Sequence, residues 1–196
     1  IIYNSKGSNY FEACYIENVT YVSEGTNAND YNVTVVDSYF ADGTTMVTKS
    51  QNSIVILDNN WWGNNTQPTY KLGNENKNPD TWLILTLNAT NKTGLLQDVT
   101  LAFKSTDGEN VTDYEGSLYP RDFVMSATNG TLADENGTID NAVVSAFEGT
   151  EGQGYYIEAT VDNQTVNLTV EDKLFIGNAT ILAEDITIPY GETQIN

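Results

Sequence analysis

The sequence predicts an all-β protein built from two different parts. Similar segments recur about every 20 residues near the start, alternating apolar runs separated by turn residues fill the second half, and no apolar run is long enough to span a membrane. We expect the last coils of a parallel β-helix over residues 1–66, a polar linker at 67–80 and a β-sandwich over 81–172. Residues 173–196 would begin a further repeat that is cut short, so the chain is interpreted as an excerpt of a longer protein.

Three segments of the first part, CYIENVT, TVVDSYF and VILDNNW, align with one another. Their polar corners are Glu17–Asn18, Asp37–Ser38 and Asp58–Asn59. One strand and one corner in each such period is typical of a parallel β-helix, in which equivalent side chains stack into ladders. The Asn and Ser members would hydrogen-bond along the ladder, while the acidic members would either lean into solvent or be bridged by calcium. The pattern does not decide which strand face points inward.

The segment NNWWGNN, residues 59–65, contains two adjacent tryptophans. Neighbouring side chains on a strand point to opposite faces, so both indoles cannot enter one core in the ordinary way. The last coil of a solenoid exposes an apolar end that atypical residues must cover. We therefore expect Trp61 to take the slot of Phe40 and point into the stack. Trp62 would lie over the rim, and Gly63 would let the chain leave the coil.

Asparagine and threonine are frequent, with 24 and 25 copies, and chance alone would give about three N-x-T triplets. Eleven occur, which predicts an exported and N-glycosylated protein; the alternative is that both residues are simply common in β-proteins. The candidate glycosylation sites are Asn18, Asn32, Asn64, Asn88, Asn91, Asn110, Asn129, Asn136, Asn163, Asn167 and Asn178.

Charge and composition exclude several classes of function. A net charge of -19 disfavours nucleic acids and anionic membranes as partners. The absence of histidine excludes a Ser-His-Asp triad and the usual zinc sites, and Cys14 cannot form an internal disulfide. A carboxylate pair from Asp37 and Asp58 is conceivable for glycoside hydrolysis, but the pattern indicates no cleft around it. We therefore predict no enzyme activity and no resident cofactor, apart from the calcium alternative.

Alternating runs in the second half predict short antiparallel strands. They cover residues 82–89, 97–104, 121–127, 139–147, 153–162 and 165–171, with a hairpin turn at 163–165. The predicted core comprises Trp82, Leu85, Leu87, Leu101, Phe103, Val124, Val143, Phe147, Ile157, Val166 and Leu168.

A coil pattern that ends in DNNWWGNN and is followed by TWLILTLNAT resembles the adhesin-like surface proteins of methanogenic archaea. The segments FVMSATNGTL, GTIDNAVVSAF and GYYIEATVDNQTVNLTV are similar to invasin- and intimin-type bacterial Ig-like repeats. The resemblance covers nearly the whole chain. It implies a β-helix that ends in an NWWG motif, followed by an Ig-like β-sandwich, in an extracellular protein of the archaeal cell surface without a catalytic signature.

We therefore expect a non-catalytic stalk and domain joint that takes part in adhesion to other cells or to extracellular glycans. The segment would be monomeric and would not touch a membrane. Tyr15, Tyr39 and Trp62 are the candidates for stacking on sugars, with packing inside strands as the alternative for the tyrosines. A polysaccharide-binding or polysaccharide-degrading β-helix protein, a lyase or hydrolase, remains the alternative function.

Overall fold

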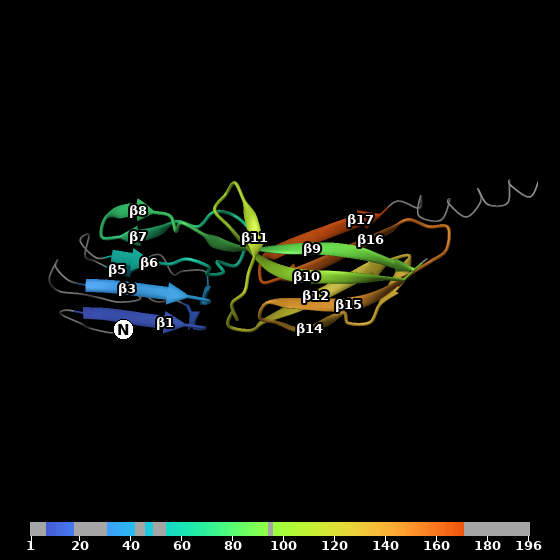
Figure 1. The fold of residues 1–196 in the computed structure, drawn as a ribbon, viewed down its shortest axis with the longest axis horizontal. Helices are drawn as coiled ribbons and strands as arrows, with labels where there is room; N and C mark the ends of the chain where they lie inside the picture. Colours follow the sequence, from blue (N-terminus) through green and yellow to red (C-terminus); the bar gives the residue numbers. More distant parts are fainter. Residues whose placement is uncertain (1–6, 18–30, 42–45, 49–53, 94–95, 171–196) are drawn as a thin grey trace, which may run out of the picture.

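The computed structural model describes residues 7–17, 31–41, 46–48, 54–93 and 96–170, and these contain strands but no helix. The all-β prediction is therefore confirmed. The strands form two modules placed end to end in an elongated molecule (Figure 1). We name residues 7–80 the parallel module and residues 81–170 the antiparallel module. The predicted further repeat at 173–196 lies outside the described residues.

The parallel module consists of short strands. They are β1 (Gly7–Glu12), β2 (Tyr15–Ile16), β3 (Tyr31–Val36), β4 (Tyr39–Phe40), β5 (Met46–Thr48), β6 (Ile54–Ile56), β7 (Tyr70–Leu72) and β8 (Glu75–Lys77). Parallel pairing joins β1 to β3 and β3 to β6, and it also joins β2 to β4 and β5 to β7. The similar segments are thus stacked side by side with their strands parallel.

The register of this stack differs from the predicted alignment. Tyr10 pairs with Thr34, and Thr34 pairs with Ile56. The number of residues between paired positions is therefore larger, in both cases, than the alignment of the three segments predicts. Glu17 and Asp58 are therefore not equivalent to Asp37, and the predicted ladder of carboxylates does not form.

The three stacked segments share a sharp left-handed corner instead. The residues in the row of Asp37 are Ala13 and Asn59, and all three have a positive φ of 50 to 54°. Asparagine and aspartate are tolerated in this conformation better than other residues with a Cβ. The polar residues that the sequence places at these corners are thus explained by the backbone.

Alternating side chains of the central strand decide which face is inward. Val33 and Val35 are fully buried, and Leu57 is buried beyond the end of β6, whereas Ile54 and Ile56 are exposed. These inward residues pack with Ile16, Phe40 and Tyr70 in a small apolar core. The predicted linker at 67–80 contributes to this core, because it folds into the antiparallel hairpin of β7 and β8 and buries Tyr70. The prediction of a simple polar linker was wrong at this point.

Two antiparallel sheets make up the antiparallel module. The first contains β9 (Trp82–Thr93), β10 (Leu96–Thr106), β11 (Val111–Asp113), β13 (Gly130–Leu132) and β15 (Ala142–Gly149). The second contains β12 (Arg121–Thr128), β14 (Asn136–Ile139), β16 (Tyr155–Val161) and β17 (Gln164–Val170), in the order β14-β12-β16-β17. The predicted runs all contain strands, but the run at 139–147 is divided between β14 and β15 at Asp140–Asn141.

The two sheets enclose one large apolar core, and nine of the eleven predicted core residues belong to it or to its margin. Trp82 is buried but lies outside this cluster. Val124 is exposed, with 60% of its surface accessible to solvent. Its neighbours Phe123 and Met125 are buried instead, because a strand alternates faces and a shift of one position exchanges inside for outside.

Candidate functional site at the joint between the modules

The stack of the parallel module continues directly into the first strand of the antiparallel module. The backbone N–H of Tyr39 donates to the carbonyl of Cys14 at 2.8 Å, and the backbone N–H of Trp61 donates to the carbonyl of Ser38 at 2.9 Å. The same bond recurs a third time, from Leu83 to the carbonyl of Asn60 at 3.0 Å. The start of β9 therefore forms the next step of the row, before β9 turns to its antiparallel partner β10.

A ladder of polar side chains supports this row from within. Ser38 Oγ accepts a hydrogen bond from the Cys14 N–H at 2.9 Å, and Asn60 Oδ1 accepts one from the Ser38 N–H at 2.8 Å. Asn60 is fully buried, and its Nδ2 donates to the carbonyls of Val35 and Leu57 at 2.6 and 2.8 Å. The predicted corner ladder of Asn18, Ser38 and Asn59 is therefore wrong in its last member, while Asn18 lies outside the described residues.

The two tryptophans serve different modules. Trp62 stacks on Phe40 with ring centroids 4.1 Å apart and planes at 8°, so it occupies the slot that the sequence assigned to Trp61. Trp61 follows Tyr39 in the row, is completely buried, and contacts Phe103 of β10 at a centroid distance of 5.0 Å. The predicted slot is thus wrong, because the true register is shifted by one position, although Trp61 is the more buried of the two, as predicted. Each indole enters the core of a different module.

Asp162 connects the modules through its carboxylate. It lies in the tight turn between β16 and β17, with φ of 53°, and its side chain is only 10% exposed. The indole Nε1 of Trp61 donates to Oδ2 at 2.7 Å. Arg121, the only arginine in the sequence, donates to Oδ1 at 2.6 Å and to Oδ2 at 3.2 Å. We call Trp61, Arg121 and Asp162 the inter-module clamp.

A second connection runs through the residues that follow the tryptophans. Asn65 Oδ1 accepts from the N–H of Leu85 at 2.7 Å, and Asn65 Nδ2 donates to the Leu85 carbonyl at 2.9 Å. The Asn65 N–H donates to Gln164 Oε1 at 2.7 Å, and the Asn163 N–H donates to the carbonyl of Gly63 at 3.3 Å. Gly63 has a φ of 83°, which agrees with its predicted role where the chain leaves the stack.

Asp37 extends the joint on another side. Its Oδ1 accepts a hydrogen bond from the hydroxyl of Tyr114 at 2.9 Å. Burial raises the pKa of the Asp37 carboxyl above its ordinary value, although the bond from Tyr114 acts in the opposite direction. A Cβ at Gly116 would come within 2.6 Å of Asp37 Oδ1, so a larger residue there would displace the Asp37 side chain. Asp37 therefore faces a tyrosine of the antiparallel module and does not pair with Asp58. The carboxylate of Asp58 accepts a hydrogen bond from the backbone N–H of Thr81 instead.

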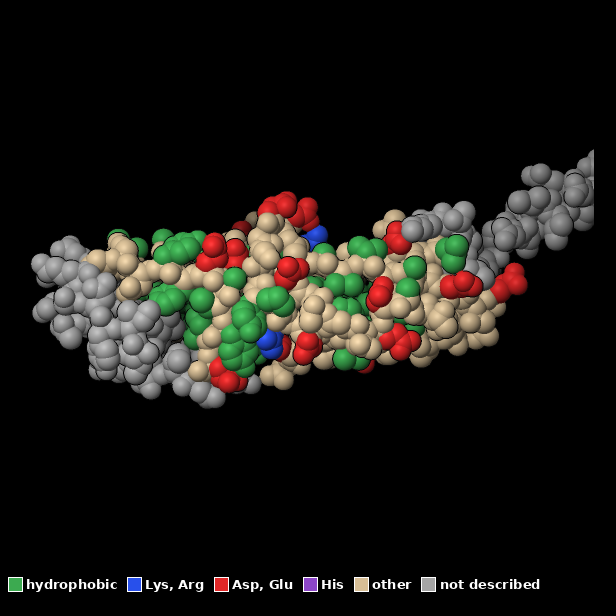
Figure 2. All heavy atoms as spheres, turned by 90° about the horizontal axis from the view of Figure 1, so that it is seen from below, with side chains coloured by type: hydrophobic (Ala, Val, Ile, Leu, Met, Phe, Trp, Pro, Cys, Tyr) green, Lys and Arg blue, Asp and Glu red, His purple; other side chains and the backbone are tan. Residues whose placement is uncertain are grey.

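Of the residues predicted to stack on sugars, only Tyr15 presents much of its ring to solvent. Tyr39 is buried under the guanidinium of Arg121, 4.0 Å from its ring centroid, and Trp62 is covered by Phe40 on one face. Tyr15 is 43% exposed and lies 5.6 Å from the ring of Tyr119, which is 38% exposed. Figure 2 shows hydrophobic side chains beside a basic one near the meeting point of the modules, with acidic side chains spread over the rest of this face.

The predicted glycosylation sites are mostly accessible. Six of these side chains are exposed: Asn88, Asn110, Asn129, Asn136, Asn163 and Asn167. Asn32 and Asn64 are half-buried, Asn18 and Asn178 lie outside the described residues, and so does the side chain of Asn91. The amide nitrogen of Asn129 donates one of its two hydrogens to the carbonyl of Gly154 at 2.7 Å, so a glycan there would take the place of the other hydrogen.

Within the described part of the chain, Cys, Asp and Glu side chains do not gather in groups of three or more that could hold a metal ion. The same residues include no helix long and apolar enough to cross a membrane. Comparisons with protein-family models, with curated proteins and with solved structures give no significant match.

Sequence reasoning missed the residues that form the joint, namely Asp162, Arg121, Asn60, Asn65 and Tyr119. The sequence did carry one indication that β9 continues the stack. The spacing in sequence between Asn59–Trp62 and Thr81–Ile84 equals the spacing between Asp37–Phe40 and Asn59–Trp62. The partners of Asp162 have no such signal, because Trp61 lies far away in the sequence.

Proposed function

We propose that this chain is a non-catalytic part of an adhesin-like protein of the cell surface, in which it serves as stalk and domain joint. In this proposal the parallel module is the end of a β-helix and the antiparallel module is an Ig-like sandwich, as the sequence resemblance implies. The supporting observation is the hydrogen-bonded row that runs from Cys14 and Tyr39 through Trp61 into Leu83. It joins two architectures into one elongated body without a flexible linker, which suits a spacer that holds other parts of a protein away from a surface.

Exposure of six candidate glycosylation sites supports an extracellular location at the cell surface. Glycans at these positions would cover much of the antiparallel module and leave little area for a broad binding face. The partners would be glycans or surface proteins of other cells, contacted mainly outside these residues. The molecule would be monomeric, with no contact to membranes or nucleic acids in this segment.

A binding screen tests this function. The glycosylated chain is applied to glycan arrays and to intact cells. We expect weak or no binding by this chain. Strong binding by the chain alone would contradict the stalk assignment.

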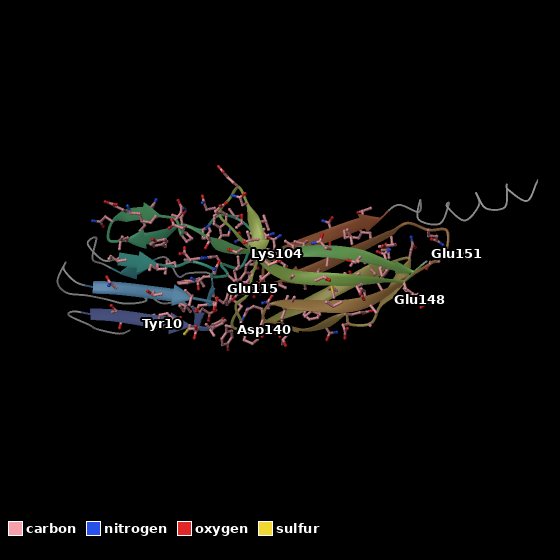
Figure 3. All side chains as sticks on the ribbon, in the orientation of Figure 1. Tyr10, Lys104, Glu115, Asp140, Glu148 and Glu151 are labelled. Carbon is pink, nitrogen blue, oxygen red and sulfur yellow. The ribbon has the colours of Figure 1, made fainter. Side chains whose placement is uncertain are left out.

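Polysaccharide binding is the second candidate, because Tyr15 and Tyr119 present two exposed rings, one from each module. Aromatic rings of this kind can stack on the apolar face of a pyranose. If this candidate is correct, Tyr15→Ala and Tyr119→Ala each abolish binding on the same array. Tyr10→Ala is the matched control, because Tyr10 is an exposed tyrosine on β1, away from the joint (Figure 3). Equal binding by all three variants would rule out this site.

A further inference from the structure

The joint contains the carboxylate of Asp162, which is hydrogen-bonded to residues of both modules. We infer that the carboxylate of Asp162 fixes the two modules in one orientation and makes them unfold as a single unit. The inference concerns contacts within this chain and does not depend on location at a cell surface or on any ligand.

The carboxylate of Asp162 accepts hydrogen bonds from donors in both modules. Trp61 belongs to the stack of the parallel module, whereas Arg121 is the first residue of β12 in the antiparallel module. Both donors reach Asp162 at distances of 2.6 to 2.7 Å, which are short for N–H donors and typical of charge-assisted bonds. A change in the angle between the modules would have to lengthen at least one of these bonds.

The ion pair between Arg121 and Asp162 is largely buried. The side chains of Arg121 and Asp162 are 17% and 10% exposed, so water cannot readily replace a partner that is lost. Removing one member of a buried pair leaves an uncompensated charge, which is far more costly than the loss of a pair at the surface.

Arg121 also contacts two aromatic rings of the parallel module. Its guanidinium lies over the ring of Tyr39 at 4.0 Å and 5.4 Å from the centroid of Tyr15. The ion pair with Asp162 holds the guanidinium of Arg121 in a fixed position over the rings of Tyr39 and Tyr15. Without the carboxylate the guanidinium would seek water, and the contact to Tyr39 and Tyr15 would weaken.

Asp162→Asn is the decisive variant, because asparagine keeps the shape and tolerates the left-handed backbone of this turn but lacks the charge. Asp122→Asn is the matched control. Asp122 is an exposed carboxylate next to Arg121 on β12, so its loss changes net charge equally without touching the clamp.

The orientation is measured on the full chain with spin labels at Tyr10→Cys and Glu151→Cys, in a background in which Cys14 is replaced by serine. Both positions are exposed and lie toward opposite ends of the molecule (Figure 3). The unmodified joint should give one narrow distance distribution, and so should Asp122→Asn. Asp162→Asn should give a broad one. A distribution that stays narrow would overturn the inference on orientation.

Coupling is measured by hydrogen exchange at the amides of Val33 and Val35, which lie in the core of the parallel module. Loss of one hydrogen-bonded charge should accelerate their exchange by about 10- to 100-fold if the modules open together. Acceleration confined to the turn between β16 and β17 would overturn the inference. If Asp162→Asn fails to fold, Trp61→Phe serves as the second variant, because it removes the indole N–H but keeps an aromatic ring. We expect it to accelerate the exchange of Val33 and Val35 by a smaller factor. Unchanged exchange rates in this variant would refute the clamp.

Discussion

The two modules bury their apolar residues in different ways. The antiparallel module has strands of up to 12 residues and closes two sheets around a core that draws on both. The parallel module has much shorter strands, and its own core gathers six buried residues. Tyr39, Ala41 and Trp61 of the parallel module are buried in the core of its neighbour instead.

This difference indicates how a stack of parallel strands can end. A stack leaves an open apolar face at its end, which must be covered. Here the next step of the stack is the first strand of the neighbouring module, and Trp61 fills the space between them. The end of the stack is therefore covered by the antiparallel module, whose first strand continues the stack, and not by a separate cap.

Replacing Trp61 is expected to have the largest effect. Trp61→Ala removes a fully buried indole and a donor to Asp162, and should lower the free energy of unfolding by about 3–5 kcal/mol. Trp62→Ala is the control, because its half-buried ring packs on Phe40 within the parallel module alone, and should cost less. Urea denaturation followed by circular dichroism checks both. Small and equal effects would mean that the tryptophans do not join the modules.

An intermediate effect is expected for the polar ladder. Asn60→Ala leaves the Ser38 N–H and the carbonyls of Val35 and Leu57 without their side-chain partner in a buried site, at a cost of about 1–3 kcal/mol. Asn76→Ala changes an exposed asparagine on β8 and should be nearly neutral. Exchange rates of the β3 amides distinguish the variants. If Asn60→Ala left these rates unchanged, the buried ladder would contribute little to the stack.

The smallest effect is expected at Asp37, and it depends on pH. Burial raises the pKa of this carboxyl in the folded state, so its favourable contribution is present below the unfolded pKa of about 3.9 and is lost as pH rises through the folded pKa. Asp37→Asn keeps an acceptor for Tyr114 and suits the left-handed backbone. It should raise stability at pH 7 by less than about 1 kcal/mol, because the site is only partly buried, and this gain should vanish near pH 3. Thermal melts at both values check this, and a gain of equal size at both would exclude desolvation as its cause.

Local patterns predicted much of the antiparallel module. The alternation around Leu85, Leu101 and Ile157 places these side chains in the core because the period of a strand is fixed by backbone geometry. The same rule explains the error at Val124, since the pattern RDFVMSA supports either face when read alone. Pairing of β12 with β14 and β16 decides that Phe123 and Met125 point inward.

The sequence by itself determined that the protein is all-β, that similar strands recur in its first part, and that its first and second parts differ in architecture. These properties depend on side chains close together in sequence. Tertiary structure alone decided the true register of the repeats, the module that each tryptophan enters, and the meeting of Trp61, Arg121 and Asp162. The physical reason is that register in a parallel stack depends on the lengths of the intervening loops and on burial across rungs. A buried charge, likewise, finds its partners only once distant segments have packed together.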